Sequence, residues 1–248
     1  MSFSDEEITV YLDFGEQLAD AAARVTLGYF RTPLDVEHKA GKGMFDPVTR
    51  ADREAETVIR NMIADAYPSH GMLGEEHGLE ERGTDWTNRI YWVIDPIDGT
   101  RAFISGLPLW GTLIALNDGD GPILGVVDIP ATGERFRGAP GIATLQQRGR
   151  AEVKTLKSRH CPALDQATLS TTDPALFQAG DERAAFDRLV EKAKLTRYGY
   201  DCYAYCMVAA GHIDLVVESG LEAFDIQALV PLIEASGGIV TDWQGGPA

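Results

Sequence analysis

The sequence predicts a mixed α/β protein of the α+β kind. Three observations predict it: apolar residues recur at helical intervals near the N-terminus, short apolar segments separated by Gly, Asp and Pro fill the middle, and strands alternate with helices afterwards. The chain has 248 residues, of which 44% are hydrophobic, so it is long and apolar enough to bury a sizeable core.

Two helices and a β meander are expected in the first part of the chain. Helical spacing runs over residues 5–30, until Arg31 and Pro33 end it, and again over residues 49–67, before Pro68. Residues 71–73 form a short apolar stretch. Strands are then expected at residues 90–94, 109–116, 123–129, 134–137 and 143–147.

In the second part, strands at 168–171, 196–200, 213–218 and 239–241 are expected to alternate with helices at 181–193, 201–210 and 225–236. Gly237 and Gly238 end the last of these helices. No linker-like stretch marks a boundary. We therefore predict two closely packed halves, residues 1–150 and 151–248, that share an interface near residues 140–165.

Charge and cysteine content restrict the function classes. The 22 basic and 38 acidic residues leave a net charge of −16, which disfavours nucleic acid as a partner. An acidic N-terminal segment and short apolar runs argue against a secretory signal or a membrane span. Cys161, Cys202 and Cys206 are an odd number without a Cys-x-x-Cys motif. A cytoplasmic protein is expected, with Cys202 and Cys206 as small buried helix residues.

The densest signal for chemistry follows the strand expected at 90–94. Asp95 and Asp98 stand three residues apart in the segment DPIDGT, with the Ile97 carbonyl between them. Oxygen ligands of this kind suit Mg²⁺, and the end of a strand is a common ligand site in α/β proteins. If Gly99 and Thr100 open a helix, their amides can bind phosphate. A tight turn capped by Asp95 is the structural alternative.

Three further segments place acids where they can join this site. Glu75 and Glu76 follow the apolar stretch at 71–73, Asp52 lies near the start of the second helix, and Asp225 opens the helix expected at 225–236. Each acid alone is more simply explained as a solvated side chain or a helix N-cap. Their joint presence favours one site built from distant parts of the chain.

Together these segments resemble the inositol monophosphatase family. They are DPVTRAD (46–52), GEE (74–76), DPIDGT (95–100) and FDIQALVPLIEASGG (224–238), in the family's order and at about its intervals. The resemblance implies a layered α-β-α-β-α sandwich of the inositol monophosphatase and fructose-1,6-bisphosphatase type. Residues 100–116 and 198–205 are most similar to the bacterial branch that contains histidinol-phosphate phosphatases.

The resemblance also implies a Mg²⁺-dependent phosphomonoesterase with two to three ions in the site. In the family pattern, one ion is held by Glu75, Asp95 and the carbonyl of Ile97. A second is held by Asp95, Asp98 and Asp225, and a weaker third lies near Glu75. Such metals lower the pKa of water, neutralise phosphoryl oxygens and stabilise the leaving alkoxide.

Other roles follow from the same resemblance. Asp52 and Thr100 position and deprotonate the attacking water, Glu75 contributes to that step, and Asp98, Gly99 and Thr100 bind the phosphate. An acidic protein can attract a phosphate monoester only where cations reverse the local charge, so the same acids predict metal dependence.

Substrate choice is expected to depend on the second half. Asp201, Glu218 and Asp225 match positions that contact the alcohol portion of the substrate. Asp201 and Glu218 can pair with an ammonium or imidazolium group, which favours histidinol phosphate. Inositol monophosphate, a 3′(2′),5′-bisphosphate nucleotide or a sugar phosphate are alternatives. For Asp201 a helix N-cap remains the structural alternative.

Some features depart from the family pattern or stay open. Lys39 and Lys42 compete for one expected lysine position, and Phe224 stands where Trp is common. The family continues with a strand and a helix beyond the position of Ala248, so the end is either truncated or represents only the ordered part. A homodimer is expected from the resemblance. A non-catalytic regulatory partner with a retained metal site is the competing class.

Overall fold

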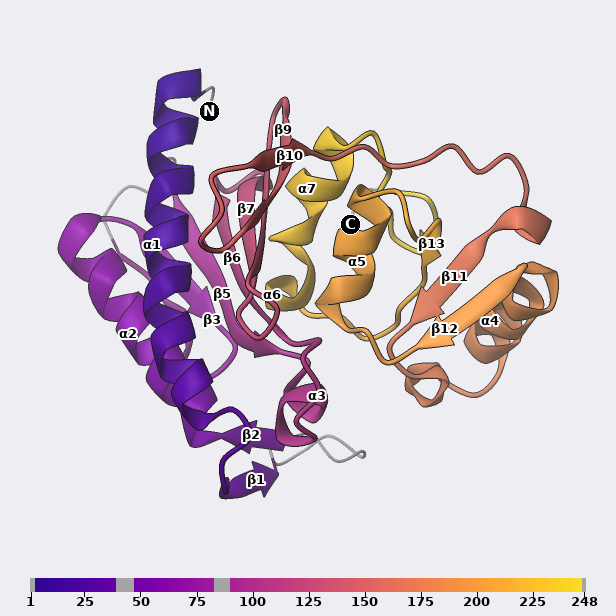
Figure 1. Ribbon diagram of the computed structural model, residues 1–248, viewed down its shortest axis with the longest axis horizontal. Coiled ribbons are helices and arrows are strands. Elements are labelled where there is room, and N and C mark those ends of the chain that lie inside the picture. The colour runs from indigo at the N-terminus through magenta and orange to yellow at the C-terminus, as the bar shows by residue number, and fades with distance from the viewer. Residues whose placement is uncertain (1–2, 39–46, 83–89, 247–248) are drawn as a thin grey trace.

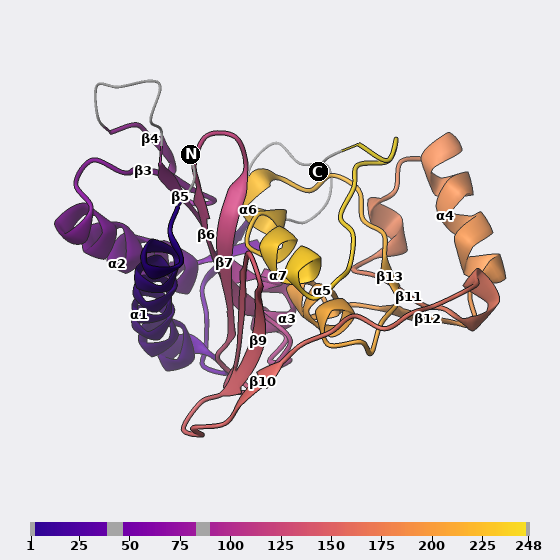
Figure 2. The ribbon, with the colours of Figure 1, turned by 90° about the horizontal axis from the view of Figure 1, so that it is seen from above.

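Five layers of helix and sheet are stacked in the order α-β-α-β-α (Figure 1 and Figure 2). The structure, a computed structural model, describes residues 3–38, 47–82 and 90–246. The layers are α1 (Asp5–Tyr29) with α2 (Arg50–Ala66), an eight-stranded sheet, α5 (Cys202–Ala209) with α6 (Ala223–Ile226) and α7 (Leu229–Ala235), a three-stranded sheet, and α4 (Asp181–Lys192). The predicted layered sandwich is confirmed.

The large sheet is mostly antiparallel, in the order β10-β9-β8-β7-β6-β5-β3-β4, and only β3 and β5 run parallel. Its strands are β3 (Gly71–Gly74), β4 (Gly78–Glu80), β5 (Tyr91–Asp98), β6 (Gly111–Asn117), β7 (Pro122–Ile129), β8 (Glu134–Ala139), β9 (Ile142–Gln147) and β10 (Val153–Thr155). Strands β5 to β9 form the meander that the sequence predicts, and β10, which it does not predict, extends the meander by one strand.

Side chains that alternate along the central strands contribute to two hydrophobic cores, one on each face of the large sheet. On one face, Trp92 and Ile94 of β5 pack with the buried residues of α1 and α2. On the other face, Val93 packs with residues of α5 and α7. Because side chains alternate along a strand, β5 is apolar on both faces and buried between helix layers. It is therefore a rigid support for the acids at its end.

The small sheet is parallel, in the order β12-β11-β13, with α4 on its outer side (Figure 1). Its strands are β11 (Thr168–Thr171), β12 (Leu195–Tyr198) and β13 (Leu215–Val216). Smaller elements are the pair β1 (Val36–His38) and β2 (Pro47–Thr49), α3 (Thr100–Ile104), and the 3₁₀ turns Leu164–Gln166 and Pro174–Leu176. Among the described residues, no helix combines the length and apolar character that crossing a membrane requires.

The structure extends the strand expected before Asp95 and confirms the expectation for the cysteines of α5. The strand expected at 90–94 continues to Asp98, with a register shift between Asp95 and Asp98. The two carboxylates therefore belong to an irregular strand end, and the turn begins only at Gly99. Cys202 and Cys206 are free and buried, as predicted.

The C-terminal expectations are partly wrong. The helix expected at 225–236 is interrupted after Ile226, because the ring of Pro231 has no N–H to donate to the Gln227 carbonyl and would clash with it in a continuous helix. The strand expected at 213–218 shortens to Leu215–Val216. No strand forms at 239–241, where the side chain of Ile239 is 84% exposed and no ladder partner exists among the described residues.

Candidate active site

Three acids from two distant segments meet beside the end of β5. Asp95 and Asp98 lie on that strand and Asp225 on α6, and one carboxylate oxygen from each lies within 4.8 Å of the others. The Asp225 Oδ2 accepts a hydrogen bond of 2.7 Å from the Glu222 amide, and α6 packs on β5. The capping hydrogen bond thus fixes the orientation of the Asp225 carboxylate. We call these three residues the acid cluster.

Electrostatics make the acid cluster unfavourable without cations. Asp95 is only 2% exposed, and burial, followed by repulsion from Glu75 and Asp98, raises the pKa of its carboxyl far above the ordinary range. Burial and the charges of Asp201 and Asp225 raise the pKa of Asp98 in the same direction. A divalent cation among these oxygens would remove both penalties.

Glu75 reaches the site from the parallel neighbour of β5. Its amide donates to the Ile94 carbonyl at 3.2 Å, which continues the pairing of β3 with β5 beyond Gly74. Repulsion from Glu75 contributes to the raised pKa of Asp95, so the two carboxylates are neighbours. The structure therefore brings three of the four predicted metal-binding acids into the acid cluster and places the fourth, Glu75, next to Asp95.

Sequence reasoning missed the residue that holds the Glu75 segment in place. Glu56 of α2 is fully buried, accepts hydrogen bonds from the Glu76 amide (2.7 Å) and the His77 amide (3.2 Å), and pairs with Arg60 Nε at 2.6 Å. A Cβ at Gly74 would overlap the Glu56 carboxylate, so the close approach requires glycine. The sequence signal for it is the i,i+4 spacing of Glu56 and Arg60, which does not by itself reveal that the pair is buried.

We expect Glu56→Gln to weaken Mg²⁺ binding by roughly 10- to 100-fold, the usual effect of removing an outer support of a metal ligand. The neutral amide cannot both balance Arg60 and accept the two backbone amides. Titration calorimetry on metal-free protein measures the change. Glu54→Gln, an identical change at an exposed ion pair on the same helix, is the matched control. Unchanged Mg²⁺ affinity in a folded Glu56→Gln protein would contradict this role.

Asp52 and Thr100, the residues predicted to position and deprotonate water, differ in their hydrogen bonds. The Asp52 Oδ2 accepts hydrogen bonds from the Thr49 amide (2.9 Å) and hydroxyl (2.6 Å), whereas its buried Oδ1 has no hydrogen-bond partner among the described residues. Burial raises the pKa of Asp52 to about 6, and Glu75 adds to the shift. The Thr100 hydroxyl donates to the Ile97 carbonyl at 3.1 Å. Asp52 is therefore both an N-terminal capping partner of α2 and a carboxylate with one open oxygen.

Asp201 lies against Gly99 at the start of α3. A Cβ on Gly99, whose φ is +81°, would come 3.1 Å from the Asp201 Cγ. Asp201 itself has φ +45°, a strained conformation for a residue with a side chain. It occupies the N-cap position of α5 but its side chain makes no capping hydrogen bond. Asp98 Oδ2 instead accepts from the Cys202 amide at 2.7 Å. Asp201 is therefore the N-cap residue of α5 by position, as the structural alternative has it, but its side chain does not cap the helix.

Glu218 approaches the same region from the carboxyl end of the small sheet. Its carboxylate accepts hydrogen bonds from the Thr172 amide (2.7 Å) and the Thr171 hydroxyl (3.3 Å). Burial raises the pKa of Glu218 to about 7, and the charge of Asp201 adds to this effect. Burial likewise raises the pKa of Asp201 to about 6, against the opposing charge of Arg101. Asp201 and Glu218 thus lie beside the acid cluster, on the side formed by residues 151–248.

The donor set fits Mg²⁺. It offers hard carboxylate oxygens and one backbone carbonyl, which are the ligands that this ion prefers. The buried Asp52 Oδ1, unpartnered among the described residues, is a second indication, because such an oxygen is normally satisfied by a water or a ligand. Lys39 and Lys42 lie outside the described residues, and the structure does not choose between them.

A comparison with known protein families agrees with this geometry. The profile of the inositol monophosphatase family matches residues 7–248. The chain belongs to the inositol monophosphatase family. The phosphatases of this family are Mg²⁺-dependent, and the acid cluster of this member agrees with that chemistry.

Relatives of this inositol monophosphatase family member carry related but different names. The chain is 43% identical over 244 residues to bifunctional phosphatase IMPL2, chloroplastic, of Arabidopsis thaliana, covering 98% of this chain and 67% of IMPL2. It is 34% identical over 239 residues to histidinol-phosphatase of Chlorobaculum parvum, covering 96% and 88%. The structure of an inositol monophosphatase from Zymomonas mobilis superposes with a TM-score of 0.82 at 39% identity, covering 99% and 90%.

Proposed function

We propose that this family member hydrolyses histidinol phosphate to histidinol. The observation that carries the proposal is the pair Asp201 and Glu218, two partly buried acids with raised pKa values beside the acid cluster. A substrate that brings an ammonium or imidazolium group would neutralise them, whereas a neutral polyol would leave Glu218 without an added positive charge and Asp201 with only that of Arg101. The similarity to histidinol-phosphatase of C. parvum supports the same substrate.

In the proposed reaction, Glu75, Asp95, the Ile97 carbonyl, Asp98 and Asp225 would hold two to three Mg²⁺ ions. The bound ions would supply charge neutralisation for the phosphoryl oxygens, a lowered pKa for water and stabilisation of the leaving alkoxide. The chain's own electrostatic contribution comes from fixed carboxylates on β5 and α6, whose positions require no reorganisation during the reaction.

The remaining residues orient water and substrate. Asp52 receives the proton of the attacking water at its open Oδ1, since a pKa of about 6 suits a base near neutral pH. Thr100 positions that water through its hydroxyl. Gly99, Thr100 and Asp98 line the phosphate position, and Asp201, Glu218 and Asp225 contact the alcohol portion. Asp201 and Glu218 would pair with the cationic groups of histidinol.

Inositol 1-phosphate is the second candidate substrate. Two relatives support it: IMPL2 is named a bifunctional phosphatase, and the similar structure from Z. mobilis is named an inositol monophosphatase. A regulatory partner without activity is disfavoured because the chain keeps the whole set of predicted metal-binding acids together with Thr100, which catalysis would need and metal binding alone would not.

A substrate panel tests the proposal. Purified protein is assayed for phosphate release from histidinol phosphate, inositol 1-phosphate, fructose 1,6-bisphosphate and adenosine 3′,5′-bisphosphate, with and without Mg²⁺. We expect release only with Mg²⁺ and the highest kcat/KM for histidinol phosphate. A higher kcat/KM for inositol 1-phosphate would contradict the proposal and favour inositol 1-phosphate as the substrate. Absence of release from all four would support the regulatory alternative.

A further inference from the structure

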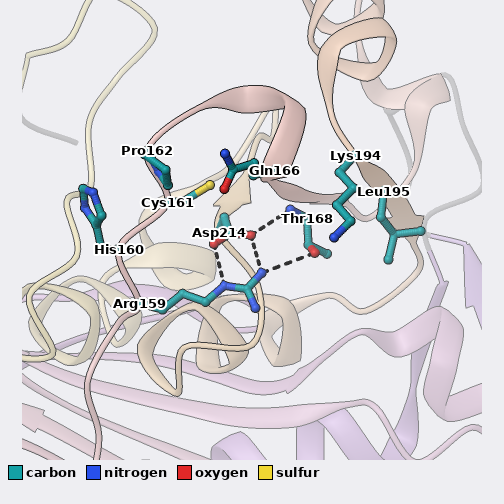
Figure 3. A pocket seen from close by; sticks show the side chains of 9 residues that line it. All are labelled: Arg159, His160, Cys161, Pro162, Gln166, Thr168, Lys194, Leu195 and Asp214. Atoms are coloured by element: carbon teal, nitrogen blue, oxygen red, sulfur yellow. Dashed lines mark hydrogen bonds and ion pairs between the residues drawn. The ribbon is translucent and has the colours of Figure 1, made fainter.

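A cavity of about 370 Å³ lies where the three parallel strands of the small sheet begin (Figure 3). Thr168 opens β11, Leu195 opens β12, and Asp214 directly precedes β13. Glu218 and Thr171 lie at the opposite ends of these strands, beside the proposed active site. The cavity is therefore separated from that site by the length of the small sheet.

An ion pair forms the floor of the cavity. The Asp214 carboxylate accepts hydrogen bonds from Arg159 Nε at 2.6 Å, from Arg159 Nη2 and from the Thr168 amide at 2.7 Å. The side chain of Asp214 is only 3% exposed. The single negative charge in the lining is thus balanced by one arginine, whose guanidinium is held in a fixed orientation. The Nη1 of Arg159 has no hydrogen-bond partner among the described residues.

Two further side chains of the lining offer free hydrogen-bond donors. Within the described part of the chain, the Lys194 ammonium and the Gln166 amide make no side-chain hydrogen bond or ion pair. Figure 3 shows the Lys194 side chain extending towards Thr168, on the rim opposite Cys161. Arg159 and Lys194 together leave one unbalanced positive charge in the lining. This is a locally cationic cavity on a chain whose net charge is −16.

We infer that this cavity binds a small anion through a carboxylate or phosphate group. Lys194 supplies the unbalanced charge, while Arg159 Nη1 and the Gln166 amide supply directional donors. The volume suits a small metabolite, because ligand cavities in proteins begin at about 300 Å³. The inference is independent of the proposed substrate, since neither the acid cluster nor Glu218 lines the cavity.

Experiments on metal-free protein separate anion binding at the cavity from anion binding at the acid cluster. Without Mg²⁺ the acid cluster repels anions, so bound phosphate reports on the cavity. Metal is removed with a chelating resin, because a soluble polycarboxylate chelator is itself an anion that could compete. Inorganic phosphate, and separately malonate, are titrated by calorimetry at low salt, where such contacts are least screened.

We expect saturable binding of one anion to the wild-type protein and an affinity roughly tenfold lower or worse in Lys194→Met, since a charged hydrogen bond is lost. Lys192→Met, the same change at an exposed lysine at the end of α4, should leave the affinity unchanged. Comparing phosphate with malonate tells whether the bound group is a phosphate or a carboxylate. The inference fails if neither probe binds saturably, or if both lysine variants bind as tightly as the wild type.

Discussion

Asp95→Asn is expected to abolish Mg²⁺-dependent phosphate release, with a fall in kcat of at least about 10³-fold. Asp95 lies at the centre of the acid cluster, next to Glu75 and Asp98, so its loss removes a ligand from both proposed main ion positions. Asparagine can still accept the hydrogen bond that the Ile97 amide donates to Asp95 Oδ1 at 3.0 Å. The local backbone should therefore survive, and the measurement is a phosphate-release assay over a range of Mg²⁺ concentrations.

The same variant should unfold at a higher temperature than the wild type when both are metal-free at neutral pH. A carboxyl whose pKa is raised by folding stabilises the protein at acidic pH, and that contribution is lost as pH rises through the folded-state pKa. Asparagine carries no charge to lose, so the difference in Tm should shrink towards acidic pH. Asp187→Asn, at an exposed ion pair of α4, serves as the control. Retained activity, or a lower metal-free Tm, would count against the proposed site.

Glu218→Gln and Asp201→Asn are expected to change substrate preference. Each should lower kcat/KM for histidinol phosphate by roughly 10- to 100-fold, because a charge-assisted contact to the substrate cation is lost. Hydrolysis of inositol 1-phosphate should change little. In Glu218→Gln, the amide carbonyl of the new side chain can still accept the hydrogen bond that the Thr172 amide now donates to Glu218. Steady-state kinetics on both substrates at pH 8 measure the two ratios.

Glu191→Gln, on the exposed side of α4, controls for a general effect of removing one acid. Equal losses on both substrates would show that Asp201 and Glu218 support the site without selecting the cation. That outcome would remove the main support for histidinol phosphate and leave the phosphatase chemistry untouched.

The fold was predictable wherever periodicity was strong. Helix α1 and the meander strands follow apolar patterns that local sequence shows directly. The interruption between α6 and α7 could also have been read from Pro231, whose position four residues after Gln227 breaks a helix. The missing strand at 239–241 could not, because strand formation depends on a neighbouring edge that sequence alone does not supply.

The sequence predicted which acids belong to the candidate site but not how they are arranged in space. The spacing in DPIDGT singled out Asp95 and Asp98, and the family resemblance added Asp225, but their convergence within 4.8 Å depends on α6 packing against β5. Glu56 stayed hidden because a glutamate on an amphipathic helix normally faces solvent, and only the fold shows it buried beneath the segment of Glu75. The strained backbone of Asp201 was equally invisible in the sequence.

The most direct test of the proposed metal site is to locate divalent ions in crystals. Crystals grown with Mn²⁺ in place of Mg²⁺ and with inorganic phosphate would give anomalous difference density at each ion. We expect peaks among the carboxylates of Asp95, Asp98 and Asp225, and beside Glu75 and the Ile97 carbonyl, with phosphate touching them. Ions bound only elsewhere, with the acid cluster empty at saturating Mn²⁺, would contradict the metal site and the phosphatase mechanism built on it.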